Sequence, residues 1–224
     1  MGPTFPDRRA AGRELARALG HLAGPDTIIL GLPRGGLPVA DEVARDLKAP
    51  LDIVLVRKIG MPGNPELALG AIAGPEGQTR VLNAELVSLY GIDAATIEAQ
   101  AAPERAELAR RRELWGTRLQ PGALRGKVVI VVDDGIATGA TMRAAIAAVR
   151  ADHPLRVVVA APVAAPDTLD QMAQLADEVV CLSAPVAFTA VGKHYTHFPQ
   201  LCDEDVRAIL AAAGSGSAVT GRAP

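Results

Sequence analysis

Aromatic residues, cysteines and long apolar runs are all scarce in this sequence. Aromatic residues make up 3% of the 224 residues, against 49% for hydrophobic residues as a whole, so aliphatic side chains must fill the core. The two cysteines, Cys181 and Cys202, fit neither a disulfide framework nor a metal-site spacing, so we expect free thiols. No apolar run reaches the ~18 residues that a membrane span needs, so no membrane partner is expected.

The sequence also lacks a large excess of positive or negative charge. The net charge is −2, which argues against non-specific binding to nucleic acid. Residues 1–9 lack the apolar segment of a signal peptide, so we expect a cytoplasmic protein. The length suits one α/β domain, expected at residues 1–212, followed by a Gly/Ser/Ala-rich disordered tail at residues 213–224.

The stretch from Gly126 to Met142 has the most informative pattern. Its β-branched run, 128–132, is too short for a helix and reads as a strand buried on both faces. Asp133 and Asp134 come directly after this strand, and an Ala-rich helix is predicted from 142 to 149. The segment between them is therefore a strand-to-helix loop that carries two carboxylates.

This loop has the composition of a phosphate-binding loop. Its small residues are Gly135, Ala137, Gly139 and Ala140. They leave the backbone N–H groups accessible to phosphate oxygens, and the N-terminus of the next helix favours the same anion. Thr138 and Thr141 add hydroxyl donors. The two carboxylates would repel a phosphate, so they are expected to accept from ligand hydroxyls or to bind a divalent cation.

A second loop, Gly31 to Gly36, follows a short apolar strand at 27–30. Gly35 and Gly36 permit close backbone approach, and Arg34 offers a forked donor for phosphate oxygens, although an ordinary turn has the same signature. Further on, Arg57 and Lys58 follow a strand predicted at 51–56. Cations at this place would lie in the crevice where open α/β sheets bind ligands, with solvated surface charge as the alternative.

Strands and helices alternate through the rest of the chain. Further strands are predicted at 156–163 and 178–182, and helices at 7–22, 38–47, 166–175 and 203–212. This alternation predicts an α/β fold with a mostly parallel, Rossmann-like sheet and helices on both faces. The first helix carries four arginines away from its apolar spacing, which reads as a solvated surface: Arg8, Arg9, Arg13 and Arg17.

The region 61–120 departs from this alternation. Strands at 67–73 and 79–82 are predicted to form a hairpin, followed by helices at 84–90 and 93–114. The second helix is rich in Glu and Arg at spacings that allow i,i+4 pairs, so it reads as a solvated helix or an oligomer contact.

Residues 128–141 resemble the 5-phosphoribosyl-1-pyrophosphate (PRPP) binding motif of type I phosphoribosyltransferases: a hydrophobic strand, two acids, and a small-residue loop ending Thr-Gly-x-Thr. The resemblance implies that Asp133 and Asp134 engage the ribose hydroxyls and Mg²⁺. It assigns the 5-phosphate to Ile136, Ala137, Thr138, Gly139, Ala140 and Thr141. It assigns the pyrophosphate to Arg34, Gly35, Gly36, Arg57 and Lys58. Asp133, Asp134, Arg34 and Lys58 would then carry the catalytic electrostatics.

The same resemblance implies a lid, a hood and a homodimer. The 67–82 hairpin would cover the active site and keep water from a reactive sugar cation. A hood at 185–202 would hold a small-molecule acceptor, through Phe188, Lys193 and Tyr195, although these rings could equally cap the sheet edge. Glu66 is a candidate general base. Family members that use 6-oxopurines carry an acid where Ala137 stands here, which disfavours hypoxanthine or guanine as acceptor.

The expected activity is Mg²⁺-dependent transfer of a 5-phosphoribosyl group from PRPP to a nitrogenous base or related acceptor, with release of pyrophosphate. Two alternatives stay open. One is a regulator that binds PRPP without turnover, and the other is transfer or hydrolysis on an acceptor that is not a base.

Overall fold

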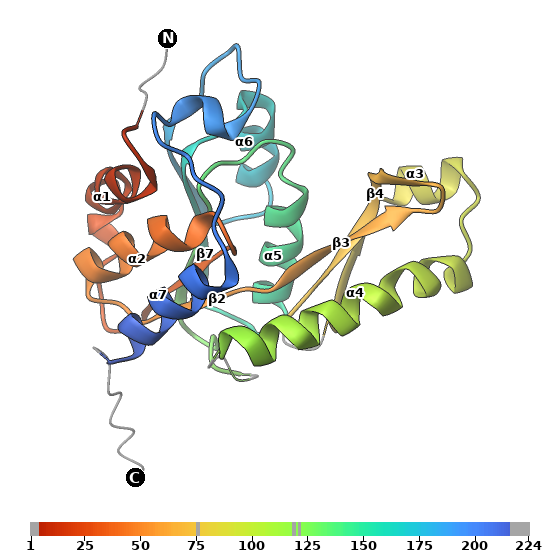
Figure 1. The fold of residues 1–224 in the computed structure, drawn as a ribbon, viewed down its shortest axis with the longest axis horizontal. Helices are drawn as coiled ribbons and strands as arrows, with labels where there is room; N and C mark the ends of the chain where they lie inside the picture. The colour runs from red at the N-terminus through yellow and green to blue at the C-terminus, as the bar shows by residue number, and fades with distance from the viewer. Residues whose placement is uncertain (1–4, 75–76, 118–119, 121, 216–224) are drawn as a thin grey trace.

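A five-stranded parallel sheet forms the centre of the protein, and a smaller antiparallel sheet projects from its side (Figure 1). The computed structural model describes residues 5–74, 77–117, 120 and 122–215. The strands of the central sheet, in spatial order, are β2 (Leu51–Ile53), β1 (Thr27–Gly31), β6 (Val128–Val132), β7 (Arg156–Val163) and β8 (Glu178–Ser183). The predicted α/β fold with a mostly parallel sheet is confirmed.

The core helices are α1 (Arg8–Ala18), α2 (Gly36–Leu47), α5 (Ala140–Arg150), α6 (Pro166–Ala173) and α7 (Asp203–Ser215). Side chains of β6 alternate between two apolar layers, because successive residues of a strand point to opposite faces. Val129 and Val131 pack with α5 and α6, whereas Ile130 and Val132 pack with α1 and α2. Both faces are thus covered, which explains the unbroken apolar run of β6.

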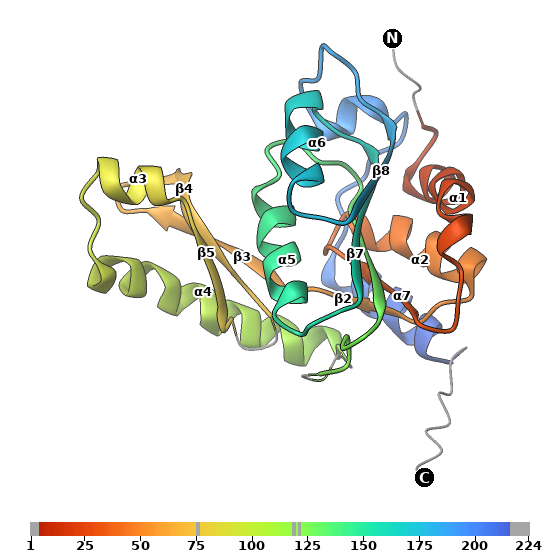
Figure 2. The ribbon, with the colours of Figure 1, turned by 180° about the vertical axis from the view of Figure 1, so that it is seen from behind.

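The projecting part, called the arm below, consists of β3 (Val56–Met61), β4 (Asn64–Ala73), β5 (Thr79–Leu82), α3 (Ala84–Leu89) and α4 (Ala94–Trp115). It extends away from the central sheet, with α3 at its far end (Figures 1 and 2). Its base is fixed by an apolar cluster that joins Leu108 and Trp115 of α4 to Ile72 of β4 and Val206 of α7. The predicted hairpin is confirmed as the antiparallel β4–β5 pair, but this pair does not fold back over the central sheet.

The strand predicted at 51–56 is confirmed only over its first three residues, which form β2. β2 has only three partners in β1, because β1 ends at Gly31, and the chain then leaves the central sheet and enters β3 of the arm. Arg57 and Lys58 consequently lie within β3, opposite Ile72 and Ala71 of β4. They do not follow the end of a core strand, as the crevice hypothesis for these two cations required.

Two helix ends differ from the prediction by three or more residues. The first helix ends at Ala18 and is followed by a short 3₁₀ turn, η1 (Gly20–Leu22). The last helix continues to Ser215, so Ala213 and Gly214 are helical rather than part of a disordered tail. The remainder of that predicted tail, residues 216–224, lies outside the described residues.

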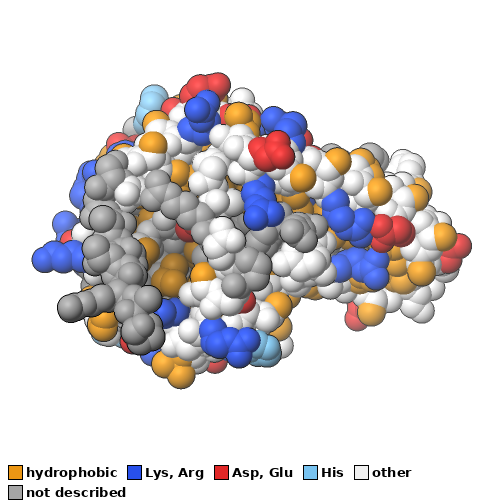
Figure 3. Space-filling model, turned by 90° about the horizontal axis from the view of Figure 1, so that it is seen from below, with side chains coloured by type: hydrophobic (Ala, Val, Ile, Leu, Met, Phe, Trp, Pro, Cys, Tyr) orange, Lys and Arg blue, Asp and Glu red, His pale blue; other side chains and the backbone are white. Residues whose placement is uncertain are grey.

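The surface of the arm carries charges of both signs. Figure 3 views the molecule from below the orientation of Figure 1, and shows basic and acidic side chains side by side on the arm. Glu107 forms an ion pair with Arg111, which confirms the i,i+4 pairing expected for this helix, and a further i,i+3 pair with Arg110.

Candidate functional site

The loop after β6 is held by hydrogen bonds to its carbonyl oxygens. Ala165 N–H donates to the oxygen of Ile136 (2.9 Å), and the Thr168 hydroxyl donates to that of Ala137 (2.7 Å). The Arg143 guanidinium donates to that of Thr138 (3.0 Å). Three consecutive carbonyl oxygens of this loop, which would repel a bound anion, therefore already accept hydrogen bonds from other parts of the protein.

The end of this loop is shaped for a helix start. Gly139 has φ of +71°, a conformation that suits glycine, and it directly precedes α5. Thr138 and Thr141 are exposed to solvent on either side of it. The positive end of α5 and two accessible hydroxyls thus occupy the place where the sequence predicted a 5-phosphate site.

The two loops predicted to bind one ligand are in contact. β1 and β6 are neighbours in the sheet, so the loops that follow them begin side by side. A Cβ atom on Gly35 would lie 2.1 Å from Asp134 Oδ2, and one on Gly36 would lie 2.6 Å from the carbonyl oxygen of Val132. Only glycine fits at these two positions. The peptide bond between Pro33 and Arg34 is cis.

Arg8 reaches Asp134 from α1, which the sequence did not indicate. Its Nε donates to Asp134 Oδ2 (2.7 Å), its NH1 donates to the carbonyl of Pro199 (2.8 Å), and its guanidinium lies 3.7 Å from the centre of the Phe198 ring. Arg8 is only 8% exposed, so its assignment to a solvated surface was wrong. The sequence did contain one indication, because Arg8 lies in the first turn of the helix. A cation is unfavourable there unless another group, such as an acid, stabilises it.

Burial raises the pKa of both acids. For Asp133, burial acts first and the neighbouring Asp134 charge adds to it, so its pKa lies well above the ordinary 3.8. For Asp134, burial also raises the pKa, but the hydrogen bond from Arg8 opposes this and favours the carboxylate. As the pH falls, Asp133 is therefore the member of the pair that takes up a proton first, whereas Arg8 keeps Asp134 ionised for longer.

Tyr195 lies beneath Asp134 and is 6% exposed. Its hydroxyl donates to the backbone carbonyl of Asp134 (2.6 Å), and its ring packs between Phe5 and Phe198. Burial, with a smaller contribution from the Asp134 charge, raises the pKa of its phenol, so the hydroxyl stays a donor. This placement makes Tyr195 a support of the acid, with its hydroxyl already engaged, rather than a ring open to an acceptor.

The other acceptor candidates lie further out in the hood. Phe188 is half-buried and stacks on His194, with ring centres 5.5 Å apart, whereas Lys193 is exposed. The side chain of Glu66, the candidate base, lies outside the described part of the structure. Arg57 donates to Glu104 of α4 (2.7 Å), and Lys58 lies at an exposed position of β3. Neither Arg57 nor Lys58 is among the residues that line the pocket described next.

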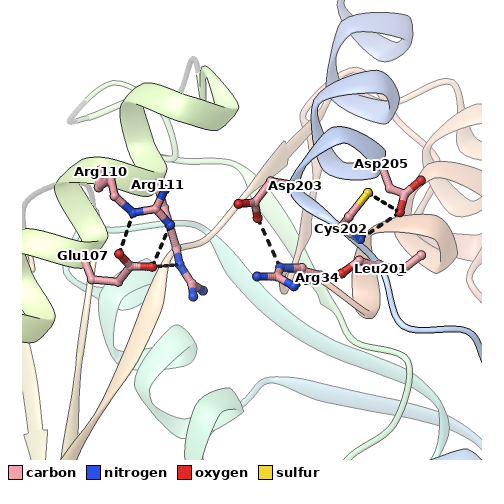
Figure 4. Close-up of polar contacts among 8 residues, drawn as sticks. All are labelled: Arg34, Glu107, Arg110, Arg111, Leu201, Cys202, Asp203 and Asp205. Carbon is pink, nitrogen blue, oxygen red and sulfur yellow. Dashed lines mark hydrogen bonds and ion pairs between the residues drawn. The ribbon is translucent and has the colours of Figure 1, made fainter.

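A pocket of about 430 Å³ opens where the loops, the hood and α4 meet. Its lining residues are Arg8, Arg34, Gly35, Arg111, Asp134, Phe198, Pro199, Gln200 and Leu201. Arg34 donates to the carbonyl of Leu201 (2.9 Å) and pairs with Asp203 (3.2 Å), and Arg111 faces this group from α4 (Figure 4). The sequence analysis also did not predict that Arg111, from the helical insertion, lines this pocket.

Two carboxylates at this place suit Mg²⁺, which commonly takes one or two protein carboxylates together with substrate phosphates. Within the described ranges there is no group of three or more His, Cys, Asp or Glu side chains that would enclose a metal ion by themselves. Likewise, no helix among the described residues is long and apolar enough to span a membrane.

A parallel sheet with two contacting strand-end loops, paired acids and a bare helix N-terminus defines a phosphoribosyl transferase domain. The phosphoribosyl transferase domain family matches residues 8–195, and the chain belongs to this family. It is 48% identical over 206 residues to a Mycobacterium tuberculosis protein named "Putative phosphoribosyl transferase", covering 92% of this chain and 46% of that protein. The chain thus spans about half the length of this curated relative.

Two further relatives extend the comparison. The crystal structure of TT1426 from Thermus thermophilus is 50% identical, has a TM-score of 0.80, and covers 93% of this chain and 98% of its own. The bifunctional protein PyrR of Pelotomaculum thermopropionicum is 32% identical over 121 residues, which are 53% of this chain and 60% of that protein.

Replacing Tyr195 by Phe is expected to lower the free energy of unfolding by about 1–3 kcal/mol, because the buried carbonyl of Asp134 loses its donor. Urea titration would measure this loss. Tyr90, which is 54% exposed on the arm, offers a matched control, since Tyr90→Phe removes a hydroxyl at the surface and should change nothing measurable. Equal stability of Tyr195→Phe and wild type would show that the Asp134 contact contributes nothing.

Proposed function

We propose that this protein transfers the 5-phosphoribosyl group of PRPP to a small-molecule acceptor and releases pyrophosphate. The observation that carries the proposal is the contact between the Gly35–Gly36 loop and Asp134. It joins a loop suited to pyrophosphate with a pair of acids suited to ribose hydroxyls, beside a helix N-terminus suited to the 5-phosphate.

Each part of the site has a role in this reaction. Loss of pyrophosphate develops positive charge at the anomeric carbon, and Asp133 and Asp134 would hold the ribose hydroxyls and stabilise that charge. Arg34 would bind the leaving group. Bound Mg²⁺ would neutralise pyrophosphate oxygens, with Asp133 and Asp134 as the protein groups available to hold it. No covalent nucleophile is required.

The fixed position of Asp134 supports this assignment. Arg8 occupies one carboxylate oxygen and Tyr195 holds the backbone carbonyl, so the remaining oxygen keeps one orientation in the pocket. A carboxylate that is already oriented needs little reorganisation as charge develops, which is the condition for effective electrostatic stabilisation. The acceptor would enter from the hood side, next to the Phe198 ring.

Titration of the protein with PRPP and Mg²⁺ in a calorimeter tests the donor site, and pyrophosphate release with a panel of bases tests transfer. Thr141→Val should weaken PRPP binding about tenfold, the effect of losing one hydrogen bond to a charged group. Ser88→Ala removes an exposed hydroxyl at the far end of the arm and serves as the control. Absence of saturable heat with wild-type protein would overturn the proposal.

Binding of PRPP without turnover of any acceptor would instead favour a regulator that senses PRPP. Slow release of pyrophosphate without a base would indicate transfer to water or to an acceptor of another class.

A further inference from the structure

We propose that Arg111 of the helical insertion forms, with Arg34, a two-guanidinium site for the pyrophosphate group of the donor. The inference rests on the proposed function and deepens it. It gives α4 a part in ligand binding, where the sequence predicted only a solvated helix or an oligomer contact.

Helical spacing places Arg111 on the inner face of α4. Leu108, Arg111 and Trp115 are separated by three and four residues, so they project from one side of the helix. Leu108 and Trp115 are buried in the apolar cluster that fixes α4 against α7. Arg111 shares this face, and its side chain is only 19% exposed. The packing of its neighbours thus fixes its position over the pocket.

The guanidinium of Arg111 is held before any ligand arrives. Its Nε donates to Glu107 Oε1 (2.7 Å), and its Cζ lies 5.2 Å from the centre of the Trp115 ring. Hydrogen bonds from Arg110 and then Arg111 lower the pKa of Glu107 to about 2, so Glu107 stays a carboxylate at neutral pH. A side chain oriented in this way loses little conformational entropy on binding an anion.

Arg34 is oriented in a similar way on the opposite wall. The carbonyl of Leu201 and the carboxylate of Asp203 hold it from the hood and from α7. Figure 4 shows Arg111 on α4 paired with Glu107 and, across from it, Arg34 paired with Asp203, whose carboxylate lies between Arg34 and α4 in this view. Two like charges lining one pocket of about 430 Å³ are stabilised by an anion between them.

Pyrophosphate is the anion that matches this arrangement. Its two phosphate groups offer one acceptor set to each guanidinium, and forked donors recognise phosphate oxygens well. Arg8, the third cation of the pocket, pairs with Asp134 in a more buried ion pair than those of Arg111 and Arg34 with Glu107 and Asp203. Arg34 borders the Gly35–Gly36 loop, so the anion would lie beside the acids that hold the ribose.

Inorganic pyrophosphate, with and without Mg²⁺, is the probe, because it tests the pair of arginines without donor or acceptor. Trp115 is the only tryptophan of the chain and lies under the Arg111 guanidinium, so its fluorescence should change on binding. Arg111→Gln is expected to weaken pyrophosphate binding about tenfold to a hundredfold. Arg111→Lys, which keeps the charge without the fork, should fall between wild type and Arg111→Gln.

Arg110→Gln is the matched control, since Arg110 also pairs with Glu107 but is 54% exposed and is not among the residues that line the pocket. It should bind pyrophosphate within about twofold of wild type, well below the loss expected for one charged hydrogen bond. Circular dichroism of each variant would confirm that the fold is kept. Equal pyrophosphate affinity in folded Arg111→Gln and Arg110→Gln would overturn the inference.

The proposed function can fail separately. If wild-type protein binds pyrophosphate through Arg111 but shows no PRPP binding, the two-guanidinium site stands and the phosphoribosyl donor is wrong. If PRPP binds and is turned over while Arg111→Gln matches wild type, the proposed function stands and the role of Arg111 is wrong.

Discussion

Asp133→Asn is expected to make the protein more stable at neutral pH while lowering transfer about a hundredfold to a thousandfold, the usual loss when one electrostatic stabiliser is removed. Burial and the Asp134 charge raise the pKa of Asp133, so ionising this group costs stability in the folded protein. An asparagine removes the charge and still accepts the hydrogen bond from the Asp134 N–H (2.8 Å in the wild type). The hydrogen bond between residues 133 and 134, and with it the local backbone conformation, should therefore be kept in the variant.

The sign of the pH dependence follows from the raised pKa. Between the ordinary carboxyl pKa of 3.8 and the higher folded value, the folded state binds more protons than the unfolded state. Wild-type stability contributed by Asp133 is thus present at acid pH and falls as the pH rises through this window. Melting temperatures of wild type and Asp133→Asn should coincide near the acid end and separate as the pH increases.

Asp170→Asn, an exposed position on α6, provides the control for this comparison, because removing a solvated charge should leave the melting curve unchanged. A lower melting temperature for Asp133→Asn throughout the pH range would contradict the prediction. It would mean that the contacts of the ionised Asp133 carboxylate stabilise the folded protein by more than the burial of its charge destabilises it.

Arg8→Met should have the largest effect on stability, a loss of about 3–5 kcal/mol, because it leaves the Asp134 carboxylate buried without its partner. With about 2–4 °C per kcal/mol for a domain of this size, the melting temperature would fall by roughly 6–20 °C. The variant should recover part of this loss at acid pH, where Asp134 becomes protonated. Thermal melts at several pH values would measure both effects.

The adjacent residue offers a matched control for Arg8. Arg9 pairs with Asp41 and Glu42, but its side chain is 43% exposed and the buried Asp41 keeps Arg45 as a second partner (3.0 Å), so Arg9→Met should cost less than Arg8→Met. The double variant Arg8→Met/Asp134→Asn should regain stability relative to Arg8→Met alone, because the unpaired charge is gone. Additive losses in this cycle would contradict a coupling between Arg8 and Asp134.

Local sequence patterns correctly predicted the strands and loops whose conformation is set by residues close together in the chain. The run at Val128–Val132, the acids after it and the small residues up to Thr141 form one continuous unit whose structure is set by β-branching, turn chemistry and a helix start. The contact between the two loops followed from the rule that parallel strands carry their ligand loops at the same edge.

The features that could not be predicted from the sequence depend on contacts between residues far apart in the chain. Arg8 and Asp134 are 126 positions apart, and nothing near Arg8 indicates an acid across the sheet. The break after Ile53 depends on the end of a neighbouring strand, so an apolar run alone suggested that β2 continued. Arg111 pairs with Glu107 at a spacing that the sequence allowed, but its contribution to the pocket depends on how α4 packs against α7.

The segment that closes the pocket also governs when the protein can first bind a ligand during its synthesis. Arg8 bonds to Pro199, 191 positions further along, and Phe5 pairs with Tyr195 in a short β-bridge. A ribosome therefore delivers all five strands of the central sheet before it delivers the wall that holds Asp134 in place. A nascent chain that has folded its sheet would still lack a complete ligand site until the segment before α7 emerges.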